Sequence, residues 1–195
     1  MRRTLDLRPL GARLLALLEG GPLARAHARR WGRLAEFQGW LAQDVLPSLT
    51  PQQALALYRA SGGRQAGRFR GSPIAEVRDA LDFLLYDPLK LEGRFEEVAA
   101  EHGGYYLPGA GKEFASYVLC VKDPALFGVW SAAAERGLRA LGLLPRPLRE
   151  GPLGVRYVDF LDLLWQARAL AGLADFPQVD TLLGAVAAHQ LPLET

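Results

Sequence analysis

The chain has 195 residues, of which 50% are hydrophobic and 23% are charged, and its formal net charge is +2. These values predict a globular protein with a sizeable core and exclude a polycation. No apolar stretch reaches the roughly 18–20 residues of a membrane-spanning helix. The single Cys120 excludes an internal disulfide and a cysteine-rich zinc site. We therefore expect a cytoplasmic protein without a membrane partner, metal or cofactor.

Most of the basic residues are arginine. Lys90, Lys112 and Lys122 are the lysines, and the rest of the 23 basic residues are arginine. GC-rich coding or thermophily is one explanation. Phosphate recognition is the other, because the guanidinium group offers a rigid two-pronged donor. The placement of the arginines must decide between them.

The N-terminal third is predicted to be helical. Residues 5–18 carry a helical stripe of leucines, interrupted by Arg8 and Arg13, which favours an amphipathic helix over a signal peptide. Residues 23–46 read as one long amphipathic helix that Pro47 closes. A third helix is predicted from Pro51, with Thr50 as its N-cap.

The rest of the chain is also predicted to be helical. Residues 61–73 form a loop rich in glycine and arginine, which divides an N-terminal part (1–60) from a second part (72–195), although one continuous domain fits as well. Ser72 is predicted to cap the next helix. The further helices are expected at 73–87, 91–104, 112–121, 131–142, 156–172 and 176–190. The fold class is therefore all-α.

A Gly-x-Gly turn precedes the helix predicted at 112–121. In "LPGAGK", Gly109 and Gly111 permit positive φ and close approach of a ligand. The first N–H groups of a helix lack intrahelical partners and attract anions. No preceding strand and no third glycine support a dinucleotide fingerprint, and Glu113 after Lys112 does not fit a P-loop. A plain turn and a phosphate cradle remain the two interpretations.

The same residues resemble the helix-hairpin-helix element of DNA-binding proteins. The match rests on Leu107, Gly109, Gly111, Lys112 and Ala115 within "LPGAGKEFASYVL". The resemblance implies that the hairpin amides hold one DNA phosphate without reading the base sequence.

A longer stretch, residues 80–143, resembles a helical module of McrB-type restriction ATPases and of small related proteins. It shares the order of an "LLY" helix, a Gly-x-Gly turn, "AS", an Asp-Pro turn, "VW" and "LGL". The resemblance implies a setting in restriction, defence or repair, with a nuclease or ATPase subunit as partner. A Walker motif is lacking, so the ATPase itself is not expected.

The helix-hairpin-helix element also marks a superfamily of DNA glycosylases. In that superfamily a catalytic aspartate follows the hairpin by about 18 residues, and bifunctional members add a lysine in the second helix. Here Trp130 or Ser131 stands at the aspartate position and Glu113 at the lysine position. Neither Trp nor Ser supplies the carboxylate that the chemistry needs. Glu135 lies one turn further on, and Trp130 would fill the pocket that receives a flipped base.

Other catalytic signals are weak. His27, His102 and His189 are far apart in sequence, and His102 fits a helix C-terminus. Cys120 lies on an apolar helix face and is predicted to be a buried structural thiol. The four tryptophans, at 31, 40, 130 and 165, lie on apolar faces and are predicted to be core residues.

Three arginine groups are candidates for phosphate contacts. The loop group, Arg64, Arg68 and Arg70 around Phe69, suits backbone contacts with stacking or wedging of the ring on a base, unless it is only a surface loop. The other groups are Arg25, Arg29 and Arg33 beside Arg30, and Arg146 and Arg149 with Arg156. The first of these is either a solvated face paired with Glu36 or a phosphate-tracking ridge.

The sequence therefore predicts a non-catalytic protein that binds duplex DNA through its backbone. The predicted contact residues are Leu107, Gly109, Ala110, Gly111, Lys112, Arg64, Arg68, Phe69 and Arg70. A DNA glycosylase and a protein-interaction module are the two alternatives.

Overall fold

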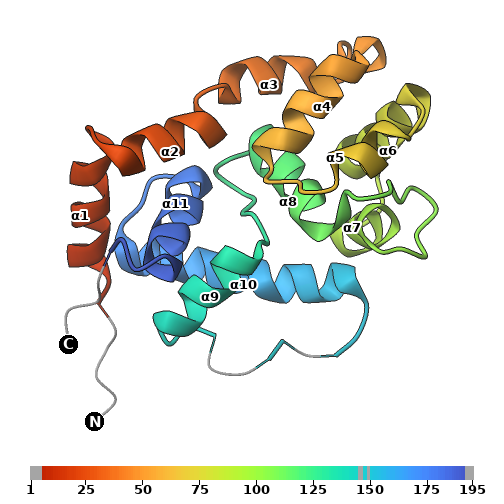
Figure 1. The fold of residues 1–195 in the computed structure, drawn as a ribbon. Coiled ribbons are helices and arrows are strands. Elements are labelled where there is room, and N and C mark those ends of the chain that lie inside the picture. Colours follow the sequence, from red (N-terminus) through yellow and green to blue (C-terminus); the bar gives the residue numbers. More distant parts are fainter. Residues whose placement is uncertain (1–5, 145–146, 149, 192–195) are drawn as a thin grey trace.

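The computed structural model describes residues 6–144, 147–148 and 150–191. Across these ranges the chain is all helices and connecting turns, without a strand, which confirms the all-α prediction (Figure 1). The α-helices are α1 Arg8–Leu18, α2 Pro22–Trp31, α3 Leu34–Trp40, α4 Pro51–Ala60, α5 Ala66–Arg70, α6 Ile74–Tyr86, α7 Leu91–Ala99, α8 Gly111–Lys122, α9 Ala132–Ala140, α10 Leu153–Ala171 and α11 Phe176–Ala187, and η1 Leu46–Ser48 is a short 3-10 helix.

The single helix predicted at 23–46 is wrong. The chain forms α2, breaks at Gly32 and Arg33, and continues as α3 and η1. Gly32 has a low helix propensity. The break also turns Trp31 and Phe37 toward the same core, where they are 4% and 2% exposed. In an unbroken helix, residues six apart would point about 120° away from each other.

Helix starts were predicted with mixed success. Thr50 caps α4 as expected, and a full capping box forms with Gln53. The predicted cap of Ser72 on α6 is wrong, because Pro73 occupies the cap position and no side chain caps the helix. The predicted loop at 61–73 also contains the short helix α5, in which Phe69 is buried.

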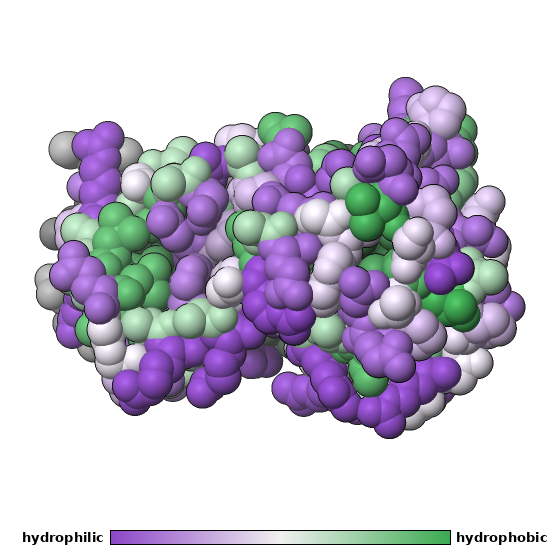
Figure 2. All heavy atoms as spheres, turned by 90° about the horizontal axis from the view of Figure 1, so that it is seen from above, coloured by the Kyte–Doolittle hydropathy of each residue, from purple (hydrophilic) through white to green (hydrophobic). Residues whose placement is uncertain are grey.

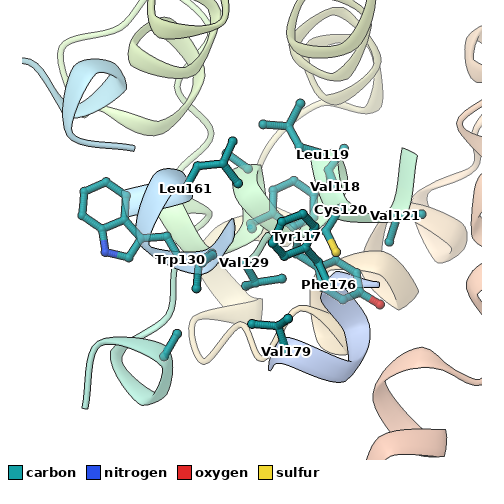
Figure 3. Close-up of a cluster of buried hydrophobic side chains, with 14 of the residues drawn as sticks. Tyr117, Val118, Leu119, Cys120, Val121, Val129, Trp130, Leu161, Phe176 and Val179 are labelled. Carbon is teal, nitrogen blue, oxygen red and sulfur yellow. The ribbon is translucent and has the colours of Figure 1, made fainter. Parts of the chain in front are cut away.

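Helix α8 lies at the centre of the molecule. Every residue from Phe114 to Val121 is buried, which is typical of a helix enclosed on all sides. Figure 3 shows Tyr117 and Cys120 of α8 in one cluster with Phe176 and Val179 of α11. The protein therefore assembles around the helix that directly follows the Gly-x-Gly turn.

The N-terminal and C-terminal helices share one core. Buried side chains extend from Leu7 to Leu191, and α1 packs on α10 while α2 packs on α11. Trp31 and Trp130 are core residues as predicted, whereas Trp165 is 39% exposed. The core therefore fixes the position of the N-terminal helices beside α8 and α11.

The surface is mostly polar on the face in Figure 2, where apolar residues form small separate patches. Among the described residues no helix combines the length and apolarity needed to cross a bilayer.

Candidate nucleic-acid interface

The Gly-x-Gly turn leads directly into α8. The segment 100–110 connects α7 to α8, and Leu107 is buried at 2% exposure while Ala110 is partly exposed. Gly109 and Gly111 both have positive φ, at 83° and 62°. Glycine reaches this region at little cost, so glycine suits both positions of the turn.

The turn packs against the start of α5. A Cβ atom on Gly109 would lie 3.1 Å from the Gln65 carbonyl oxygen and 3.4 Å from the Arg68 Cβ. The Tyr58 hydroxyl donates a hydrogen bond of 2.8 Å to the Gly109 carbonyl and accepts one of 2.9 Å from the Gln65 amide. The turn and the arginine loop, predicted separately, are thus held together by one tyrosine.

We expect Gly109→Ala to destabilise the protein more than Gly111→Ala. Both substitutions force alanine into a left-handed conformation, which costs about 1–2 kcal/mol. Only Gly109 also meets neighbouring atoms, since nothing lies within 4 Å of the Cβ position at Gly111. Urea unfolding of both variants measures the difference, and equal losses would show that Gly109 does not pack against Gln65.

A cleft of about 560 Å³ opens beside the turn. Its walls come from the loop that follows α4, the turn, the third and fourth residues of α8, the start of α9, and Arg30 of α2. Ser131 caps α9 by accepting a hydrogen bond from the Ala134 amide. The N-termini of two helices therefore border one cleft, and both favour an anion. The lining residues include Arg30, Arg64, Gly109, Glu113, Ser131 and Arg136.

Two arginines at the cleft form no ion pair within the described part of the chain. Arg64 and Arg136 are exposed, and neither forms an ion pair with another residue of the described ranges. Arg30, in contrast, forms an ion pair of 2.8 Å with Asp180 and lies 3.7 Å from Glu113. Arg30 is therefore a structural link from α2 to α8 and α11, whereas Arg64 and Arg136 are the exposed cleft arginines without an ion pair among the described residues.

Glu113 is the acidic group of the cleft. Burial raises the pKa of Glu113, and the nearby Arg30 opposes this only in part. A smaller hollow of about 220 Å³ shares Glu113, Arg30 and Ser131 with the cleft and also contains His27. Burial lowers the pKa of His27, whose Nδ1 lies 2.7 Å from the Thr181 hydroxyl.

Lys112 is bonded to another residue of the same chain. Its Nζ donates a hydrogen bond of 2.7 Å to Glu135 and lies 4.0 Å from the centroid of the Trp130 ring. The Trp130 indole donates to the same Glu135 oxygen. Although burial opposes ionisation, the bonds from Lys112 and Trp130 hold the pKa of Glu135 below its usual value. The charge predicted for the phosphate is therefore compensated by Glu135.

We expect Lys112→Met to reduce stability by about 1 kcal/mol, because it removes a charge-assisted bond from a half-buried carboxylate. A double-mutant cycle with Glu135→Gln isolates the pair. A coupling near zero would contradict the assignment of Lys112 to Glu135.

The other predicted contact residues divide into buried and exposed ones. Phe69 is 3% exposed and stacks on Tyr58 at 4.3 Å between centroids, so the predicted stacking or wedging of its ring on a base is wrong. Arg68 and Arg70 are exposed, and Arg68 donates to the Gln65 side chain. Trp130 is fully buried and Ser131 lines the cleft.

The remaining arginine groups do not converge on the cleft. Arg33 pairs with Glu36 at 2.6 Å, as one of the two interpretations predicted. Arg25 and Arg29 are exposed on α2. Arg156 lies over the Trp130 ring, while Arg146 and Arg149 fall outside the described residues.

The cysteine and histidine candidates for catalysis or metal binding have structural roles. Cys120 is completely buried as predicted, and burial raises its pKa well above the usual range. His102 pairs with Glu96 at 2.9 Å beyond the end of α7. In the part of the chain that the structure describes, no cluster of His, Cys, Asp and Glu is suited to a metal.

Sequence reasoning missed Arg136. Arg136 lies five residues after Ser131, within the helix predicted at 131–142. The sequence does not show that Arg136 and Arg64 line the same cleft. Comparison with models of known protein families, with curated proteins and with solved structures gives no significant match. The function is therefore inferred from the geometry of the cleft and from the resemblance of the turn.

Proposed function

We propose that this protein binds duplex DNA through the phosphate backbone, with little base specificity. The observation that carries the proposal is the meeting of the Gly-x-Gly turn, the N-termini of α8 and α9, and the unpaired Arg64 and Arg136 around one cleft. In this proposal residues 107–112 and α8 act as a helix-hairpin-helix-like element. The resemblance to that element and to the restriction-associated module supports it.

Each part of the cleft suits a phosphate. The first amides of α8 and α9 lack intrahelical partners and carry partial positive charge, and among those of α9 the Ala134 amide is already bonded to Ser131. Arg64 and Arg136 add two-pronged donors for phosphate oxygens. Such groups contact the sugar–phosphate backbone, which is the same for every sequence, so they position the duplex without reading it. Because Lys112 is bonded to Glu135, the amides and arginines replace it as the proposed phosphate ligands.

The proposal is tested by fluorescence anisotropy of a labelled random-sequence duplex at two salt concentrations. With Arg64, Arg68 and Arg136 as the phosphate contacts, affinity should fall about 40-fold between about 50 mM and about 200 mM salt, since each contact releases counterions. Absence of binding at the lower concentration would overturn the proposal.

We expect Glu113→Gln to strengthen duplex binding about fivefold at neutral pH by removing one negative charge from the cleft. In the wild type the same gain should appear as pH falls through the raised pKa of Glu113, which lies above its usual 4.5. The charged groups facing Glu113 are Arg30, Asp180 and Arg64.

The variant should therefore bind with a weaker pH response than the wild type. His27 of the neighbouring hollow is present in both proteins, so its titration contributes equally to both profiles. Anisotropy titrations across acidic to neutral pH compare the two. An unchanged pH profile in Glu113→Gln would place Glu113 outside the binding site.

A DNA glycosylase is the second candidate, and one observation favours it. Glu113 and Ser131, at the positions of the superfamily's lysine and aspartate, line the same cleft. Glu113 supplies a carboxyl group there. Trp130, the other residue at the aspartate position, is fully buried in the core and supplies none. Strand products from damaged duplex after alkali, lost in Glu113→Gln, would favour this candidate over simple binding.

We also propose that the chain works in restriction, defence or repair beside a nuclease or ATPase subunit. This rests on the resemblance of residues 80–143. A protein-interaction module without DNA affinity is the alternative, and it is favoured if the duplex assay shows no binding.

A further inference from the structure

A second groove lies away from the cleft, along α6 and the segment that follows α7. Two hollows, of about 410 Å³ and about 170 Å³, meet at Asp79 and Tyr105. Neither hollow shares a lining residue with the cleft. Figure 1 places α6 at the right-hand edge of the molecule. The groove therefore offers a separate binding surface.

The groove is acidic and its charges are uncompensated. Glu76, Asp79 and Asp82 lie on the exposed face of α6, and Asp87 follows the helix. None of the four forms an ion pair with another residue in the described ranges. Only Asp87 has a hydrogen bond, from the Leu89 amide. Four carboxylates along one groove repel each other and would be relieved by a cation.

Aromatic rings also line the groove. Phe83 and Tyr105 stack with centroids 4.2 Å apart and an interplanar angle of 13°. Tyr105 is 38% exposed, whereas the Tyr86 ring in the same hollow is already covered by Lys122, whose Nζ lies 4.6 Å from its centroid. The faces of aromatic rings attract guanidinium and ammonium groups. The rings and the carboxylates are separate features of the groove, and both select a cationic side chain.

We propose that this groove docks an arginine- or lysine-bearing segment of a partner protein. The carboxylates pair with the charged heads, and the Phe83–Tyr105 stack receives the flat guanidinium group or the aliphatic stem. Charge complementarity also excludes DNA from this surface, because four carboxylates repel phosphate. The protein would then hold a nucleic acid at the cleft and a basic protein segment at the groove. This inference is independent of duplex binding at the cleft.

The test measures binding of a fluorescein-labelled peptide of alternating arginine and glycine by anisotropy at low salt. The variant Asp79→Asn with Asp82→Asn removes two charges without changing side-chain size, and its affinity should fall tenfold or more. The matched control is Glu19→Gln with Asp162→Asn, which removes two exposed carboxylates of α10 and the end of α1. Its affinity should stay within about twofold of the wild type, as expected for screened distant charges.

A second pair of variants tests the rings. Tyr105→Ala should weaken peptide binding about two- to fivefold, whereas Tyr105→Phe, which keeps the ring, should bind as the wild type does. Equal losses in the groove and control double variants, or no peptide binding at all, would overturn the proposal. A concentration-dependent dimer that Asp79→Asn with Asp82→Asn abolishes would also overturn it, because the occupant would then be a second copy of the chain.

Discussion

Replacing Trp130 with alanine is expected to lower the free energy of unfolding by about 3–5 kcal/mol, the range for a fully buried aromatic residue. The Trp130 side chain is 0% exposed and stacks on Phe160 with centroids 5.2 Å apart. Its indole N–H donates to Glu135, and Lys112 lies over its ring. The substitution would therefore open a cavity and also remove one hydrogen bond from a partly buried carboxylate.

The control for this prediction is Trp165→Ala. Trp165 is 39% exposed and meets Phe176 edge-on, with Arg168 over its ring. Folding buries less apolar area at Trp165 than at Trp130. We therefore expect Trp165→Ala to lower the free energy of unfolding by roughly half as much or less. Urea unfolding followed by circular dichroism compares the two variants without relying on tryptophan fluorescence. Equal losses would show that Trp130 does not occupy the core.

The double substitution Arg64→Ala with Arg136→Ala is expected to weaken duplex binding about 100-fold, since each lost charged hydrogen bond contributes about 1.5 kcal/mol. The salt dependence should change too. The slope of log affinity against log salt should move from about −2.7 toward about −0.9 as the contacts fall from about three to about one. Both arginines are exposed and unpaired in the described ranges, so the fold should be unaffected.

Arg13→Ala with Arg25→Ala is the matched control, because both arginines are exposed on α1 and α2 and neither lines the cleft. This variant should retain the wild-type slope. If the control lost as much affinity as the cleft variant, binding would follow overall charge, and the cleft would have no special role.

Local patterns in the sequence predicted local structure well. The helix of residues 112–121, the Thr50 cap and the burial of Cys120 follow from periodicity and side-chain chemistry within a few residues. The positive φ of Gly109 and Gly111 also follows from the turn motif. Such features depend only on neighbours along the chain.

The errors arose where tertiary contacts decide. Phe69 was read as a loop residue because glycines and arginines surround it, but Tyr58 and Phe114 enclose its ring. Lys112 was assigned to a phosphate from its place in the Gly-x-Gly motif, but it is bonded to Glu135, 23 residues further along the chain. The pairing of Arg30 with Asp180 links α2 to α11, and no periodic pattern reveals such a contact. The cleft itself is assembled from four separate segments, so the sequence could name its parts but not their meeting.

We propose that a duplex phosphate binds between the Gly-x-Gly turn and the start of α9. The most direct test is a titration of the 15N-labelled protein with a short random-sequence duplex, following each backbone amide by NMR. We expect the largest shifts at the amides of Ala110, Glu113, Ala132 and Ala133, which line the cleft, and small ones at Arg25 and Arg29 of α2. Shifts confined to Arg25 and Arg29 of α2, or no shifts at low salt, would contradict it.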